Sequence, residues 1–143
     1  MRILIDTNIL ISAALFPRSV PARAYMKAVT PPYAAVVCDY SMDELRRVYN
    51  RKFPNRIQDF ERFVSVLTLS VELLSTPPIE EQRKEESAIR DMNDRPILRA
   101  ALAAKVDALL TGDKDFLESG VTHPKIMTAA EFLRFASDPC TVD

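Results

Sequence analysis

Short apolar segments of strand length alternate with longer segments of helical periodicity along most of the chain. The apolar segments lie at residues 3–5, 34–38, 71–74, 107–110 and 125–127. Strands that are separated by helices pair in parallel, and the helices then cover both faces of the sheet. The sequence therefore predicts an α/β fold with a mostly parallel central sheet.

Prolines and capping residues mark the helix boundaries. Helices are predicted at 21–29, 41–49, 94–105 and 128–136, and another is predicted to open at Pro54. The helix at 128–136 begins with Thr128 and Glu131, which have the spacing of a capping box. Residues 80–86 are too polar for a core element, so a solvated helix or loop is predicted there.

Length and composition favour one soluble domain. The chain has 143 residues, 48% of them hydrophobic and 27% charged, which suits a single core over 1–143 with a polar C-terminal tail at about 137–143. No apolar stretch approaches the ~20 residues that span a bilayer, and the N-terminus lacks a signal-peptide cleavage site. We therefore expect a cytoplasmic protein without membrane association. Cys38 ends an apolar segment and Cys140 lies in the tail, so two reduced thiols are expected.

Four acidic residues are predicted to lie near the carboxyl ends of the strands, which is where sites form in open parallel sheets. Asp6 follows the first strand directly, and Asp113 follows the strand at 107–110 after two residues. Glu44 lies in the first turns of the helix after strand 34–38, and Asp94 begins the helix that precedes strand 107–110. The alternation of strands and helices can bring all four to one edge of the sheet.

Each of these residues also has a plain structural interpretation. Asp6 and Asp94 can cap the helices that follow them, and Glu44 has the capping-box spacing from Ser41. Asp113 and Asp115 can cap the short helix at 116–117. Taken singly, capping is at least as good an explanation as function, so the functional interpretation depends on the four residues occurring together.

Clustered carboxylates predict a bound cation, because without one they repel each other or take up protons. Oxygen ligands favour Mg²⁺ or Mn²⁺ over Zn²⁺, and His123 is the only histidine, which also leaves no Ser-His-Asp arrangement. Such a cation serves phosphodiester hydrolysis. Three polar neighbours are expected to hold the carboxylates in place: Thr7, Asn8 and Thr111.

Net charge gives no general attraction for nucleic acid, since the formal charge is -1. The local pattern differs, because five basic residues occur between positions 46 and 56 without an acidic residue among them: Arg46, Arg47, Arg51, Lys52 and Arg56. They form either an edge that attracts phosphates or a solvated helix face. On this feature alone the solvated face is favoured.

Four segments in this order resemble the PIN-domain ribonucleases, in particular the toxins of toxin-antitoxin pairs related to VapC. They are ILIDTNILISA at 3–13, DELRRV at 43–48, RDMNDRPILRAAL at 90–102 and LLTGDKDFL at 109–117. The resemblance implies a three-layer α/β/α PIN-like domain with an acidic pocket for one or two Mg²⁺ or Mn²⁺ ions. The matching acidic positions are Asp6, Glu44, Asp94 and Asp113, with Asp115 as a substitute or additional member. Met92 departs from the proline that is common at its position, which affects loop stiffness more than chemistry.

The resemblance also implies a function and partners. We expect a Mg²⁺- or Mn²⁺-dependent endoribonuclease that cleaves single-stranded RNA, acts as a type II toxin, forms a homodimer and is silenced by a cognate antitoxin protein. Four basic residues are candidates for contact with the RNA backbone: Arg46, Arg90, Arg95 and Lys114. The alternatives are a PIN-domain nuclease of RNA processing or decay and a PIN-fold binding module without catalysis. A phosphatase with Asp6 as nucleophile is disfavoured, because Asn8 stands where a second aspartate would be expected.

Overall fold

Five parallel strands form one sheet in the computed structural model, which describes residues 1–135. The strands are β1 (Arg2–Ile5), β2 (Ala34–Cys38), β3 (Glu72–Leu74), β4 (Ala108–Leu110) and β5 (Lys125–Met127). Their order across the sheet is β3-β2-β1-β4-β5, and every neighbouring pair is parallel. All five predicted strands are therefore confirmed, each within one residue of its predicted start.

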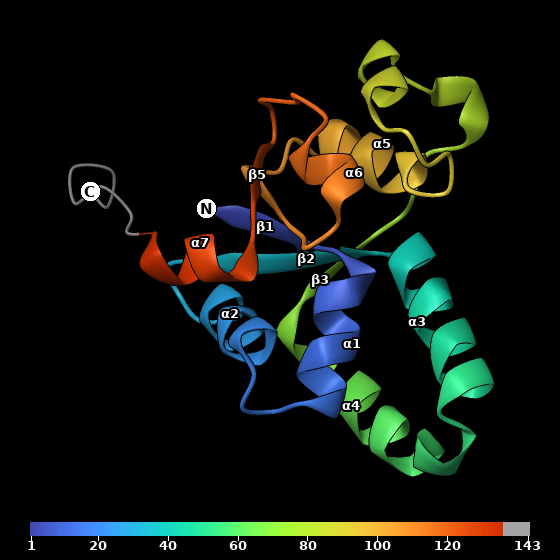
Figure 1. Cartoon of the computed structure of the whole chain (residues 1–143), viewed down its shortest axis with the longest axis vertical. Helices are drawn as coiled ribbons and strands as arrows, with labels where there is room; N and C mark the ends of the chain where they lie inside the picture. Colours follow the sequence, from blue (N-terminus) through green and yellow to red (C-terminus); the bar gives the residue numbers. More distant parts are fainter. Residues whose placement is uncertain (136–143) are drawn as a thin grey trace.

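Helices fill the connections between the strands. The α-helices are α1 (Thr7–Leu15), α2 (Val20–Ala28), α3 (Asp39–Lys52), α4 (Ile57–Ser70), α5 (Arg95–Ala104), α6 (Lys114–Leu117) and α7 (Ala129–Arg134). Short 3₁₀ turns lie at η1 (Pro54–Arg56), η2 (Ile79–Glu81) and η3 (Lys84–Ala88). Figure 1 shows α5 and α6 on one side of the sheet and α1, α2 and α4 on the other. The predicted α/β/α layering is confirmed.

Side chains of the central strands alternate between two hydrophobic cores, one on each face of the sheet. Ile3 and Ile5 of β1 belong to the core beneath α1, α2, α4 and α7, whereas Leu4 belongs to the core beneath α5 and α6. All three side chains are fully buried. A strand buried on both faces reads as a continuous apolar run, which is why the strand segments were recognisable in the sequence.

The structure confirms the predicted capping box near the C-terminus and the predicted thiol at the end of β2. The capping box of Thr128 and Glu131 is present at the start of α7, and Cys38 is a buried free thiol. The helix predicted at about 41–49 is confirmed as α3, which begins two residues earlier, at Asp39 directly after β2, and continues to Lys52. The predicted helix end at residue 136, the tail and Cys140 lie outside the described residues. Within 1–135, no helix combines the length and apolarity needed to cross a bilayer.

The solvated helix or loop predicted at 80–86 is confirmed for residues 80–84, which are exposed, but not for Glu86, which forms a buried ion pair. Glu86 is 3% exposed and Arg99 is 4% exposed, and the guanidinium donates to both carboxylate oxygens at 2.8 and 3.2 Å. Arg99 also donates to the Pro77 carbonyl at 3.1 Å. Burial alone would raise the pKa of Glu86, but the hydrogen bonds from Arg99 and the Arg83 backbone outweigh it and lower the pKa. The pair therefore ties the irregular segment after β3 to α5.

Removing one member of this pair should destabilise the protein strongly. Arg99→Met leaves the Glu86 carboxylate buried without its partner, and we expect a loss of about 3–5 kcal/mol in the free energy of unfolding. The double variant Arg99→Met with Glu86→Leu should recover much of this loss. Urea denaturation measures both, with Arg23→Met on the exposed side of α2 as a control within about 0.5 kcal/mol of the wild type. A loss for Arg99→Met no larger than for the control would show that the pair contributes little.

Candidate active site

The candidate site lies where the direction of chain progression across the sheet reverses. From β1 the chain proceeds to β2 and β3 on one side, and it then returns to place β4 on the other side of β1. Such a switch point leaves a crevice beyond the carboxyl ends of the two central strands. Asp6 follows β1, and Thr111 follows β4, so the switch point brings their side chains together.

Asp6 is held in a fixed orientation in this crevice. It is 3% exposed; one carboxylate oxygen accepts from the Thr7 backbone N–H at 2.8 Å and the other from the Thr111 hydroxyl at 2.7 Å. Burial, with smaller contributions from Glu44 and Asp113, raises the pKa of Asp6 to about 6, although the two hydrogen bonds oppose this rise. Both oxygens are already oriented before any ligand binds.

Asp94 carries the clearest sign of a missing partner. It stands at the N-cap position of α5, but its side chain makes no capping hydrogen bond. Its Oδ2 atom is buried and has no hydrogen-bond partner. Burial raises the pKa of Asp94 to about 8, and the neighbouring Asp113, Asp6 and Asp91 add to this rise. The capping interpretation of Asp94 is therefore wrong.

Glu44 and Asp113 complete the predicted acidic set, and their local roles differ. Glu44 is half-buried on α3 and its charge acts on Asp6. Since Ser41 lies inside the helix, with its hydroxyl 3.3 Å from the Cys38 sulfur, the capping-box interpretation of Glu44 is wrong. Asp113 does cap a helix, because it accepts from the Asp115 N–H at 2.9 Å, and its charge also acts on Asp6 and Asp94.

Sequence reasoning missed Asp91. One carboxylate oxygen from each of Asp91, Asp94 and Asp115 lies within 4.8 Å of the others. Asp91 also accepts from the Asn93 N–H at 2.9 Å, and this contact shapes the turn that leads into α5. The signal was the spacing of three residues between Asp91 and Asp94 in a turn, which puts both side chains on the same side of the loop.

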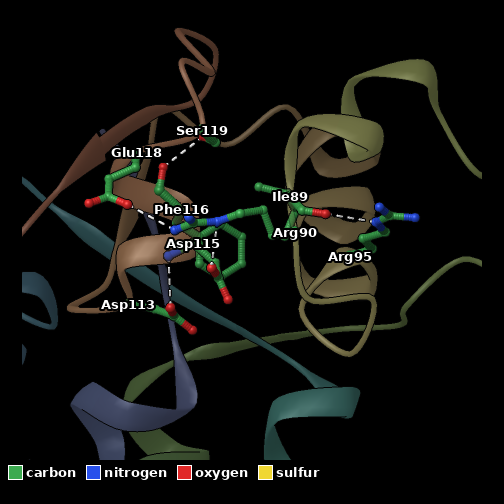
Figure 2. A network of polar contacts seen from close by, with 8 residues as sticks. All are labelled: Ile89, Arg90, Arg95, Asp113, Asp115, Phe116, Glu118 and Ser119. Carbon is green, nitrogen blue, oxygen red and sulfur yellow. Dashed lines mark hydrogen bonds and ion pairs between the residues drawn. The ribbon is translucent and has the colours of Figure 1, made fainter.

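Arg90 occupies part of this acidic surface, as Figure 2 shows. Its guanidinium pairs with Asp115 at 3.1 Å and with Glu118 at 2.8 Å. These two contacts raise the pKa of Arg90 further above its ordinary value, with the Glu118 hydrogen bond as the largest cause. Arg90 therefore connects the loop that carries Asp91 and Asp94 to the short helix α6.

Of the three predicted supporting residues, Thr7 and Thr111 contact Asp6. Thr111 supports Asp6 and also accepts from the Asp113 N–H at 3.0 Å. Thr7 contributes through its backbone N–H, whereas its buried hydroxyl has no hydrogen-bond partner. The Asn8 side chain is exposed, so the structure gives no contact through which it would orient a carboxylate.

The predicted RNA-contacting residues do not share one surface. Arg46 pairs with Glu61 at 3.8 Å and lies over the Phe60 ring. Arg95 donates to the Ile89 carbonyl at 2.9 Å and points away from Arg90 (Figure 2). Lys114 is exposed at the start of α6. Only Arg90 makes ion pairs at the edge of the acidic cluster among these four.

The donor set fits a hard divalent cation. Every candidate ligand is a carboxylate oxygen, which is the type that Mg²⁺ and Mn²⁺ prefer. The unpartnered Oδ2 atom of Asp94 and the raised pKa values of Asp6 and Asp94 are what a cluster awaiting positive charge should show. Asp6, Asp94 and Asp113, with Glu44, Asp91 and Asp115 around them, are the residues that would hold it.

A family model described as PIN domain matches residues 2–115. The chain belongs to the PIN-domain family. In this PIN-domain chain, Asp6 and Thr111 lie just beyond the carboxyl ends of β1 and β4.

Two solved structures share the fold of this PIN-domain chain. One is VapBC2 from Rickettsia felis, bound to a DNA fragment from its promoter, with a TM-score of 0.67, 17% identity and coverage of 90% of this chain and 98% of the other. The second is Mycobacterium tuberculosis VapC20, a toxin that cleaves the sarcin-ricin loop, with a TM-score of 0.64, 15% identity and coverage of 84% and 96%. Comparison with curated protein sequences finds no significant match.

The acidic cluster should make the metal-free protein less stable as pH rises. A carboxyl with a raised pKa in the folded state favours folding below its unfolded pKa, near 4, and this contribution is lost as pH rises through the folded value. The folded values are about 6 for Asp6 and about 8 for Asp94. In EDTA, Tm should therefore fall by several degrees between about pH 5.5 and 8.5.

Asp94→Asn should flatten this fall, because the asparagine amide does not ionise. Thermal denaturation at each pH measures Tm for both proteins, and added Mg²⁺ at pH 8 should raise Tm more for the wild type than for the variant. Parallel Tm curves for wild type and variant would show that Asp94 does not carry this pH dependence.

Proposed function

We propose that this chain is a Mg²⁺- or Mn²⁺-dependent endoribonuclease that cleaves single-stranded RNA, and that it is the toxin of a type II toxin-antitoxin pair. The observation that carries the nuclease proposal is the buried, unpartnered Oδ2 atom of Asp94, surrounded by other carboxylates at the switch point. A buried acceptor without a partner costs folding free energy. A divalent cation coordinated by this oxygen would offset that cost.

The residues of the site have distinct roles in this proposal. When bound, the cation stabilises the negative charge that develops on the phosphate during hydrolysis and increases the acidity of water. Asp6, held by Thr7 and Thr111, gives a fixed position for one ligand. Asp94, whose pKa is raised by burial and by the neighbouring Asp113, would lose its proton when the cation binds. Glu44, Asp91 and Asp115 supply further carboxylates around this centre.

RNA as substrate and toxicity as role draw support from family membership and from the similar structures. The two structural neighbours are a VapBC complex and a toxin that cleaves an RNA loop. A cognate antitoxin protein and a homodimer belong to the same proposal. Arg90, at the edge of the cluster, and the exposed Lys114 are the predicted basic residues best placed to meet the RNA backbone.

Cleavage of a mixed-sequence single-stranded RNA tests the nuclease. Purified protein should cut it with Mg²⁺ or Mn²⁺ and stop in EDTA, and Asp94→Asn should reduce the rate by at least about 100-fold because a charged ligand is lost. Gel electrophoresis of end-labelled RNA over time measures the rate.

The matched control is Asp43→Asn, which removes one exposed carboxylate from α3 beside Glu44. This variant should cut at close to the wild-type rate. Equal rates for wild type and Asp94→Asn would reject the assigned site, and metal-independent cutting would reject the cofactor.

Expression in a bacterial host tests the toxin role. Induction of the wild-type chain should arrest growth, whereas Asp94→Asn should allow growth at the same protein level because the acidic centre is incomplete. Colony counts after induction, with immunoblots for protein amount, give the comparison. Normal growth at high levels of a protein that is active in vitro would favour a role in RNA processing or decay.

A further inference from the structure

A polar hollow lies on α3 beside the acidic centre. It has a volume of about 330 Å³ and is lined by Tyr40, Glu44, Arg47, Val48, Arg51 and Asn93. Four of these, at positions 40, 44, 47 and 51, are spaced three or four residues apart, so they form one stripe along the helix. The hollow is thus built from one face of α3 and the loop that leads to Asp94.

The hollow lies next to the proposed metal centre. Glu44 lines it and also acts electrostatically on both Asp6 and Tyr40. Asn93 lines the hollow from the loop that faces α3, one residue before Asp94. Its backbone carbonyl accepts a hydrogen bond from the Tyr40 hydroxyl at 2.6 Å. A ligand in the hollow would therefore lie directly beside the carboxylate cluster.

Two guanidiniums in the hollow have no protein partner. Within residues 1–135, neither Arg47 nor Arg51 makes an ion pair or a hydrogen bond through its side chain, although both line the hollow. Their neighbours differ, because Arg46 pairs with Glu61 and Arg56 with Asp59. Arg46 and Arg56 of the basic run thus bind α4, whereas Arg47 and Arg51 face the hollow.

The Tyr40 ring adds an aromatic surface at the end of the hollow nearest the acidic residues. The side chain is half-buried, and its hydroxyl is fixed by Asn93, which limits rotation of the ring. Along the helix axis, Arg47 and Arg51 lie about 4.5 and 10.5 Å beyond Glu44, from the rise of ~1.5 Å per residue. An aromatic ring followed by two cations is the arrangement that binds a base and its flanking phosphates in single-stranded nucleic acid.

We propose that this hollow is a subsite for the nucleotide next to the cleaved phosphodiester, with Tyr40 stacking on its base and Arg47 and Arg51 binding the RNA backbone. The inference rests on the proposed ribonuclease function and specifies where the substrate is held. Glu44 lies between Tyr40 and Arg47 on the stripe, and its carboxylate repels a phosphate there, so the phosphates are bound further along the helix by Arg47 and Arg51. The subsite fixes the direction in which the strand leaves the centre, along α3.

Binding measured without cleavage tests the subsite. A fluorescent single-stranded RNA of mixed sequence is titrated with Asp94→Asn protein at several salt concentrations, and anisotropy gives the affinity. Arg47→Gln and Arg51→Gln should each lower the slope of log affinity against log salt by about 0.7. Tyr40→Ala should weaken binding by about 5-fold to 100-fold, whereas Tyr40→Phe retains the ring and should keep most of the affinity.

The matched control for charge is Lys105→Asn, at the opposite edge of the sheet. Lys105 is exposed and has a positive φ of 54°, which asparagine tolerates, so this variant should keep the wild-type salt slope. Circular dichroism melts confirm that each variant is folded. In cleaving protein, Arg47→Gln should raise KM several-fold with little change in kcat.

The outcomes separate the subsite from the nuclease. Salt slopes for Arg47→Gln and Arg51→Gln equal to that of Lys105→Asn, or unchanged affinity for Tyr40→Ala, would overturn the subsite even if the wild type cleaves RNA. Loss of affinity in the expected variants supports the subsite, and absence of metal-dependent cleavage in the wild type would then reject only the nuclease. Failure of the Asp94→Asn protein to bind RNA at all would overturn the subsite.

Discussion

Gathering of carboxylates around the buried Asp6 is the constraint on which the rest of this site depends. Asp6 and Asp94 lose hydration beyond the carboxyl ends of β1 and β4, and neighbouring carboxylates add repulsion, so both pKa values rise. A protein interior tolerates this only if the groups keep protons, find donors or acquire a cation. Asp6 has two donors, whereas one oxygen of Asp94 has none. This difference is the reason for proposing that a bound cation completes the environment of Asp94.

The fold creates this situation because it stabilises the strands independently of the polar edge. The side chains of β1 alternate between two cores, so the strand is fixed from both faces before its carboxyl end is reached. The buried pair of Glu86 and Arg99 fixes the irregular segment that precedes α5. An unfavourable set of carboxylates can therefore persist at the end of β1, since the free energy that holds the strand comes from elsewhere.

Most of the fold was predictable, whereas the site was predictable only in part. The central strands β1, β2 and β4 are buried on both faces and read as apolar runs, whereas the more exposed edge strands β3 and β5 were found as short apolar segments between helices. Asp6 followed from its place after β1. Asp91 and the burial of Glu86 were missed, because both depend on contacts across the loop at 75–94, which has no periodicity. The direction of each arginine also depends on partners distant in sequence, as Arg46 with Glu61 shows.

The proposed RNA substrate is a polyanion, and the position of charge on α3 makes it compatible with a net charge of -1. Glu44 faces the acidic centre, and Arg47 and Arg51 follow on the same stripe, so the sign of the charge reverses within two turns of one rigid helix. Salt screens exposed charges over ~10 Å, so attraction of this kind acts only on RNA already close to the surface. A net charge of -1 gives no general attraction for nucleic acid, so in the proposed subsite the arginines would act mainly on a strand that is already positioned at the carboxylates. Such local charge favours selection of a substrate by its shape over capture of any RNA at a distance.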